Sequence, residues 1–185
     1  HDDGQDAFLR VHVRQDENCA GSLPTLGVRP SFRELILAAP PSMTHVLVTG
    51  AAGFIGSHTV DQLLAAGHRV TGLDNLRTGR RANLQAALRS PHFRLHEGDA
   101  AEDAGVDALV AEVRPDAVIH LAALVSVQES IADPALNFRL NVQATQVVAE
   151  ACRRHRVSRL VFASSAAIYG DTAILPVTED APKAP

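Results

Sequence analysis

The sequence is poor in the residues that build disulfide frameworks and metal sites. Its only two cysteines, Cys19 and Cys152, lie in unrelated contexts and form no Cys-x-x-Cys pair, which disfavours a disulfide framework and indicates a reducing compartment. His92 and His96 are four residues apart, but the segment between them has the pattern of an extended strand. They would not share a helix face, so we expect no metal site.

Long apolar runs and an excess of positive charge are also missing. No stretch approaches the roughly 20 apolar residues that span a bilayer, and no signal-peptide pattern is present. The formal net charge of −4 provides no overall basic field for a nucleic acid. We therefore expect neither a membrane nor a nucleic acid as partner, and we expect a cytoplasmic location.

Residues 1–42 lack the hydrophobic periodicity of the rest of the chain. The only methionine, Met43, lies two residues before the first clear strand pattern. We therefore interpret residues 43–185 as the folded domain and Met43 as the natural start, with residues 1–42 as upstream read-through, a tag or a disordered arm. The chain of 185 residues, 46% of them apolar, is long enough for one domain with a real core.

From Met43 onward, strand patterns alternate with helix patterns. Short apolar runs predict strands at 45–49, 69–73, 93–96, 116–121 and 159–163. Helical spacing predicts helices at 54–67, 80–89, 104–113 and 134–155, with Gly67 as a C-cap and Pro134 in a first turn. This alternation is typical of an α/β fold, a doubly wound parallel sheet with helices on both faces.

Three glycines follow the first predicted strand in the stretch VTGAAGFIGSH, at Gly50, Gly53 and Gly56. A strand, a tight glycine turn and a helix N-terminus form an anion site, because free backbone N–H groups and the positive end of the helix dipole point at the ligand. Gly50 would permit the turn, Gly53 would let a diphosphate approach, and Gly56 would let the helix pack on the strand. The alternative is a tight turn that holds no ligand.

An acidic residue at the end of the second predicted strand indicates which dinucleotide the loop would hold. Asp74 follows Gly56 by 18 residues, close to the spacing of about 20 expected for an acid that binds a ribose 2′-hydroxyl. A carboxylate repels a 2′-phosphate, so NAD is favoured over NADP. Arg77 and Arg80 weaken this preference without reversing it.

Several further motifs follow one another along the chain. They are LDNLRTG at 73–79, EGD at 97–99, HLAALVSVQESIADP at 120–134, NVQAT at 141–145, SSAAIYG at 164–170 and LPVTE at 175–179. With the glycine loop, these motifs make residues 43–185 resemble the extended short-chain dehydrogenase/reductases of the NAD-dependent epimerase/dehydratase group, and most of all the UDP-glucose 4-epimerases. The resemblance implies a Rossmann-type fold that is truncated before its last strands and before the C-terminal substrate domain.

The resemblance also implies roles for individual positions around NAD. They are Phe54 and Ile55 at the diphosphate, Asp74 and Asn75 at the adenosine ribose, Asp99 and Ala100 at the adenine, Leu121, Ala122 and Ala123 along the cofactor, and Asn141 behind the nicotinamide ribose. Plain core packing explains residues 121–123 equally well. A buried polar side chain that hydrogen-bonds helix backbone is the alternative for Asn141.

In the family, hydride passes from a sugar C4–OH to NAD and back through a 4-keto intermediate. A tyrosine, with a lysine four residues later, removes the hydroxyl proton, and a serine or threonine hydrogen-bonds the same oxygen. Ser165 matches that serine, and Ser164 would touch the cofactor; the alternative is that both only cap the turn. Tyr169 is the only tyrosine and Lys183 the only lysine, 14 residues apart, so the chain has no Tyr-x-x-x-Lys.

These matches predict an N-terminal fragment of a nucleotide-sugar 4-epimerase that has no activity by itself, with the missing pair expected just past Pro185. Ala166 and Ala167 occupy places where sugar dehydratases carry acids, which favours an epimerase over a dehydratase. The other alternative is a non-catalytic NAD-binding sensor or interaction module. The resemblance implies a nucleotide sugar as the substrate, and a homodimer of the full-length protein through the helix at 134–155.

Overall fold

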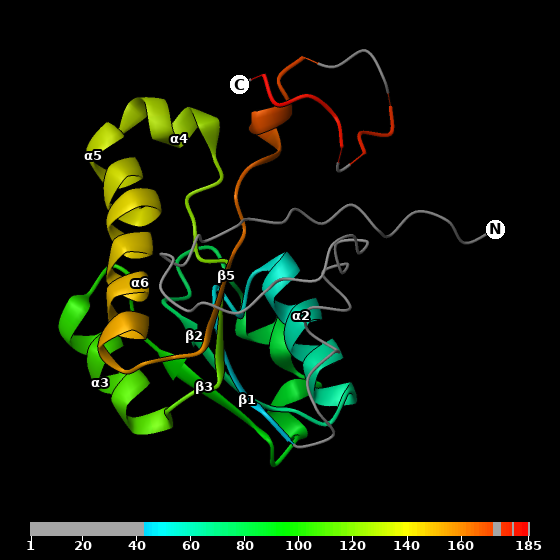
Figure 1. Ribbon diagram of the computed structural model, residues 1–185, viewed down its shortest axis with the longest axis vertical. Coiled ribbons are helices and arrows are strands. Elements are labelled where there is room, and N and C mark those ends of the chain that lie inside the picture. Colours follow the sequence, from blue (N-terminus) through cyan, green and yellow to red (C-terminus); the bar gives the residue numbers. More distant parts are fainter. Residues whose placement is uncertain (1–42, 172–174, 179, 185) are drawn as a thin grey trace, which may run out of the picture. The chain divides into compact units, whose positions relative to one another are not determined.

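The structure is a computed structural model that describes residues 43–171, 175–178 and 180–184 (Figure 1). The chain divides into two compact units, one that ends at Phe162 and one that includes the chain from Ala163 onward. Each unit is described by itself. The prediction for residues 1–42 lies outside the described residues.

Five parallel strands form the sheet of the first unit. Their order across the sheet is β3-β2-β1-β4-β5, and every neighbouring pair is parallel. The strands are β1 (His45–Thr49), β2 (Arg69–Asp74), β3 (Phe93–Glu97), β4 (Ala117–His120) and β5 (Arg159–Phe162). The order reverses between β1 and β4, as in a doubly wound sheet, so the predicted fold class is confirmed.

Helices cover both faces of this sheet. Helix α2 (Phe54–Ala65) lies on one face, and α3 (Asp103–Val113) and α6 (Ala144–Arg154) lie on the other (Figure 1). Strand residues on the second face, such as Leu47 and Val118, share one buried cluster with Val110 of α3 and Val148 of α6. Because helices cover both faces, consecutive residues of the inner strands are buried rather than alternate ones, as in β1, where all five residues are buried.

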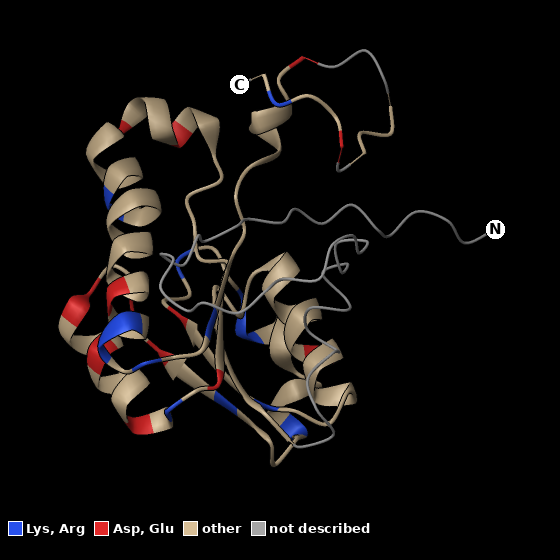
Figure 2. Cartoon of the chain, viewed as in Figure 1, with Lys and Arg blue, Asp and Glu red and all other residues tan. Residues whose placement is uncertain are grey.

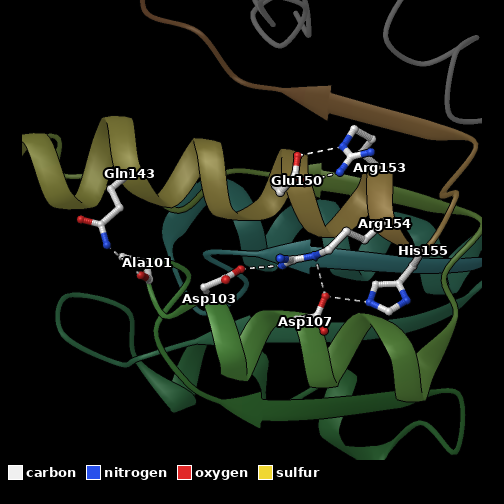
Figure 3. Close-up of polar contacts among 8 residues, drawn as sticks. All are labelled: Ala101, Asp103, Asp107, Gln143, Glu150, Arg153, Arg154 and His155. Atoms are coloured by element: carbon white, nitrogen blue, oxygen red, sulfur yellow. Dashed lines mark hydrogen bonds and ion pairs between the residues drawn. The ribbon is translucent and has the colours of Figure 1, made fainter.

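Charged side chains join α3 and α6 at their solvent side. Arg154 pairs with Asp103 at 2.5 Å and with Asp107 at 2.9 Å, and His155 contacts Asp107 at 2.8 Å (Figure 3). Figure 2 shows the acidic residues gathered over α3, next to the basic end of α6. These groups are between about a quarter and three-fifths exposed, so the pairs align the two helices but contribute little stability.

Two predicted helices differ from the observed ones. The segment predicted at 80–89 forms only two short 3₁₀ turns, η1 (Arg81–Leu84) and η2 (Ala87–Arg89). The backbone N–H of Arg80 and the side chain of Asn83 both donate to the Ala52 carbonyl oxygen, at 3.0 and 2.8 Å. These bonds tie the segment to the glycine loop, and Pro91 disfavours further helix at its end.

The segment predicted as one helix at 134–155 is helical but not uniform. It consists of α5 (Pro134–Asn137), a π-helical stretch η3 (Phe138–Gln143) and α6. A short helix that we did not predict, α4 (Val127–Ala132), precedes it. Its sequence signal is a serine with an acid three residues later, since the Ser126 hydroxyl caps the helix by accepting from the Glu129 N–H at 3.2 Å.

Among the described residues, no helix combines the length and the apolar character that crossing a membrane requires. The same part of the chain contains no group of three or more metal-ligating side chains placed to hold an ion.

Candidate dinucleotide site

The loop between β1 and α2 leaves no room for side chains at two of its glycines. Gly50 has a φ of +68°, a left-handed conformation that favours glycine. A Cβ atom on Gly56 would lie 2.0 Å from the Gly50 carbonyl oxygen, and one on Gly50 would lie 2.7 Å from the Ala122 nitrogen. The loop is therefore packed against both the first turn of α2 and the segment that follows β4.

The first turn of α2 begins without a capping side chain. Gly53 is the N-cap residue, no side chain caps it, and no acid lies in the first turn. Phe54 and Ile55 are 80% and 43% exposed, so the surface at this turn is open. The first N–H groups of a helix need an acceptor from outside the helix, and a phosphate suits them. This turn therefore fits the diphosphate of a dinucleotide.

Asp74 ends β2 as a buried carboxylate, 8% exposed. Its Oδ2 accepts from the Ala52 N–H and its Oδ1 from the Leu76 N–H, each at 2.8 Å. The carboxylate thereby ties the glycine loop to the turn after β2. It keeps lone pairs for a ribose hydroxyl, because an ionised carboxylate offers about four acceptor sites. Next to it, the exposed Asn75 accepts from the Arg77 N–H at 3.0 Å.

Two arginines near the carboxyl ends of β2 and β3 are held by acids. Arg77 forms an ion pair with Glu129 of α4. Arg139 of η3 pairs with Asp99, so the Asp99 side chain is engaged within the protein. Ala100, the next residue, is buried. Both predicted adenine-side positions therefore have structural contacts of their own, and their contact with adenine stays a prediction.

Two side chains anchor the segment that follows β4. The Thr49 hydroxyl oxygen accepts the N–H groups of Leu121 and Ala122, each at 3.2 Å. The Asn141 side chain accepts from the Leu124 N–H at 2.7 Å and donates to the Leu124 carbonyl oxygen at 3.1 Å. The segment is thus held at both ends.

These anchors bear on the two alternatives left open by the sequence. Asn141 does bond to backbone, but to the loop after β4 rather than to its own helix. Leu121 and Ala122 are partly buried, whereas Ala123 is exposed, so core packing does not account for all three. Their contacts with a cofactor stay predictions.

The sheet topology explains why distant motifs meet. Carboxyl ends of neighbouring parallel strands lie at the same edge, so the residues after β1, β2 and β4 converge where the strand order reverses. We did not assign roles to Thr49, His120 or Glu129, which the structure places among these segments. His120 belongs to the HLAA stretch, but its hydrogen-bond partners, Thr49 and Thr145, lie in other elements. No local sequence pattern therefore indicated the contacts of His120.

The predicted serines lie in the second unit. The Ser165 hydroxyl oxygen accepts from the Ala167 N–H at 3.1 Å and caps the 3₁₀ turn η4 (Ala166–Tyr169), and Ser164 is partly buried. Capping uses an acceptor site, so the Ser165 proton remains available for donation. The Lys183 ammonium lies over the Tyr169 ring, 5.6 Å from its centre.

Comparison with known proteins gives this geometry a context. Residues 46–185 match the family model described as the NAD dependent epimerase/dehydratase family. A UDP-glucose 4-epimerase of Mycolicibacterium smegmatis is 46% identical over 140 residues, which are 75% of this chain and 44% of that protein. The chain therefore spans less than half of the length of this curated relative.

Two solved structures resemble the chain in fold and sequence. The UDP-glucose 4-epimerase of Thermus thermophilus in complex with NAD has a TM-score of 0.67 and 43% identity, over 76% of this chain and 44% of that one. The Brucella ovis enzyme in complex with NAD also has a TM-score of 0.67, with 39% identity over 77% of this chain and 42% of that one. With its parallel sheet, glycine loop and uncapped helix, the chain belongs to the NAD-dependent epimerase/dehydratase family.

Proposed function

We propose that this chain is the NAD-binding part of a nucleotide-sugar 4-epimerase of the UDP-glucose/UDP-galactose type. One observation carries the proposal. The N-terminus of α2 is exposed and has no capping side chain, and it directly follows a glycine loop whose Ala52 N–H is bound by the Asp74 carboxylate. Two relatives that match the chain, from Mycolicibacterium smegmatis and Neisseria meningitidis, are named UDP-glucose 4-epimerase, and related structures were determined with NAD.

The residues at this edge of the sheet would bind and orient the cofactor. The first N–H groups of α2 would hold the diphosphate, with Phe54 and Ile55 beside it. Asp74 would accept from the adenosine ribose hydroxyls and repel a 2′-phosphate. When bound, NAD would supply the redox chemistry at C4 of the sugar.

The second unit would contribute a hydrogen bond to the reacting sugar. Ser165 would donate its free proton to the C4 oxygen, because its capping bond uses only an acceptor site. Ala166 and Ala167 follow in η4, and their methyl side chains cannot move protons. This supports an epimerase over a dehydratase, which would need an acid there.

These 185 residues lack a Tyr-x-x-x-Lys pair, since the only tyrosine and the only lysine are 14 positions apart. Without the base that removes the sugar proton, we infer that the chain by itself binds NAD but does not interconvert nucleotide sugars. The alternative is a non-catalytic NAD-binding sensor or interaction module, which the absent pair favours. Reading the coding sequence beyond residue 185 distinguishes the two: a Tyr-x-x-x-Lys pair within about ten codons supports the epimerase.

We further propose that the full-length protein is a cytoplasmic homodimer. Phe138 and Val142 of η3 are 59% and 50% exposed, so the helical segment around them offers apolar area to a second copy. Light scattering of the full-length protein tests this, and a monomer would contradict it.

Calorimetric titration of the 185-residue chain with NAD, and separately with NADP, tests the cofactor assignment. We expect saturable NAD binding and at least tenfold weaker NADP binding. An assay that follows UDP-galactose conversion is expected to show no turnover. Absence of NAD binding would contradict the proposed cofactor role, whereas turnover would contradict only the inferred inactivity.

A further inference from the structure

A buried histidine at the end of β4 has no part in the function proposed above. His120 is 2% exposed, and its ring stacks on the Phe162 ring with the centres 5.9 Å apart. Its Nδ1 lies 2.6 Å from the Thr49 hydroxyl oxygen, and its Nε2 lies 3.2 Å from the Thr145 hydroxyl oxygen. The histidine therefore connects β1 to α6 through two hydroxyl groups.

The hydrogen bonds around the ring have only one consistent direction. The Thr49 hydroxyl oxygen already accepts from two backbone N–H groups, which occupy both of its lone pairs. Its single proton must therefore point to Nδ1 of His120. At the far side, the Thr145 hydroxyl donates to the Asn141 carbonyl oxygen at 2.7 Å, so it accepts from Nε2. The ring is neutral, with its proton on Nε2.

This direction matters for the loop beside Gly50. If Nδ1 carried a proton, the Thr49 oxygen would have to accept three hydrogen bonds with two lone pairs, and a loop N–H would lose its partner. The Ala122 N–H is the vulnerable one, because the Leu121 N–H also reaches the Thr49 backbone carbonyl oxygen at 3.2 Å.

We propose that His120 is a positioning residue: by accepting the Thr49 proton at Nδ1, it turns the Thr49 hydroxyl so that it holds Ala122 against the glycine loop. The proposal rests on the proposed function, because that loop borders the NAD site. The backbone of Ala122 packs directly against Gly50, so closely that a Cβ atom on Gly50 would not fit. A displaced Ala122 would therefore disturb the loop that receives the diphosphate.

Two substitutions of similar size separate positioning from simple stabilisation. In His120→Asn, the side-chain oxygen can take the place of Nδ1 and accept from Thr49, but the bond to Thr145 is lost. In His120→Gln, the longer side chain can reach Thr145, but it offers no acceptor at the position of Nδ1. Each variant loses one hydrogen bond, so their losses of stability are expected to be similar.

Two measurements distinguish the effects of the two histidine variants. Hydrogen exchange of the Ala122 amide, measured by NMR without NAD, is expected to be at least tenfold faster in His120→Gln than in His120→Asn. The Kd for NAD is expected to rise about tenfold in His120→Gln and to stay within about threefold of the unmodified chain in His120→Asn. Equal exchange rates and equal Kd values in the two variants would overturn the proposal.

A second pair of variants, in which threonines are substituted, decides the question if a histidine variant fails to fold. Thr49→Val is expected to speed Ala122 exchange as His120→Gln does, and Thr145→Val is expected to leave it unchanged. Fast exchange in both threonine variants would show a general loosening and overturn the proposal. If the unmodified chain does not bind NAD, the proposed function fails, while the exchange rates still decide the role of His120.

Discussion

At the scale of single residues, Gly56 lies where any side chain would meet the Gly50 carbonyl oxygen. In Gly56→Ala, the added carbon would be 2.0 Å from that oxygen, so the loop must shift. We expect a loss of about 2–3 kcal/mol in the free energy of unfolding and at least a tenfold rise in the Kd for NAD. Urea unfolding and calorimetric titration measure the two effects.

Gly105 of α3 provides the matched control. A Cβ atom there would have its nearest neighbour at 3.6 Å, an ordinary contact, and alanine favours a helix. Gly105→Ala is therefore expected to stabilise the chain by roughly 0.5–1 kcal/mol and to leave NAD binding unchanged. NAD binding by Gly56→Ala with the affinity of the unmodified chain would contradict the proposed role of the loop.

His120 also makes stability depend on pH. Burial lowers the pKa of His120 from 6.5 to about 4, so the unfolded chain binds more protons than the folded chain between these values. The stabilisation is present above pH 6.5 and is lost as the pH falls toward 4, in total by roughly 3 kcal/mol. Burial and the charge of Arg69 also lower the pKa of His45, which adds a change of the same sign.

Urea unfolding at pH 7.5, 5.5 and 4.5 measures this dependence. The His120→Asn variant has no group that titrates at this position, so its stability is expected to fall less steeply over the same range. A variant with the same slope as the unmodified chain would assign the pH dependence to other groups.

At the scale of secondary-structure elements, helix α4 supplies the acid that pairs with an arginine near the predicted ribose site. Glu129 of α4 pairs with Arg77, which follows Asp74 by three residues. In Glu129→Gln the arginine is released, and it can attract a 2′-phosphate. We expect the Kd for NADP to fall about three- to tenfold, and the Kd for NAD to change less than twofold.

Titrations of the two cofactors measure this selectivity. Glu150→Gln is a suitable control, because it removes an acid that pairs with Arg153 on α6 and changes the net charge equally. An equal change in NADP affinity in both variants would show a general charge effect and contradict the role of α4.

At the scale of the whole molecule, NAD binding is expected to stabilise the fold. A ligand that binds only the folded chain adds about 2.7 kcal/mol at a concentration of 100 times its Kd, which raises the Tm by roughly 8 °C for a chain of this size. Calorimetry with NAD measures the shift. The same concentration of NADP is expected to give a clearly smaller one, and equal shifts would contradict the selectivity assigned to Asp74.

The fold and the conformation of the glycine loop could be predicted from the sequence because both depend on local patterns. An apolar run such as 45–49 indicates a strand buried on both faces, and alternation with helices leaves few topologies besides a parallel sheet. The glycine spacing indicated the turn, because only glycine fits at Gly50 and Gly56. Family-specific motifs added the expected cofactor and the proposed reaction class, which periodicity alone does not provide.

The contacts that complete the site were decided only by the tertiary structure. Asn141 and Leu124 are 17 residues apart, His120 and Thr145 are 25 apart, and Arg77 and Glu129 are 52 apart. Each pair meets because α4, η3 and α6 follow β4 and return beside the carboxyl edge of the sheet. The sequence by itself therefore determined the sheet and the glycine loop between β1 and α2, since strand periodicity and glycine spacing are local. Which side chains hold that loop in place depends on how distant elements pack, and no local pattern encodes it.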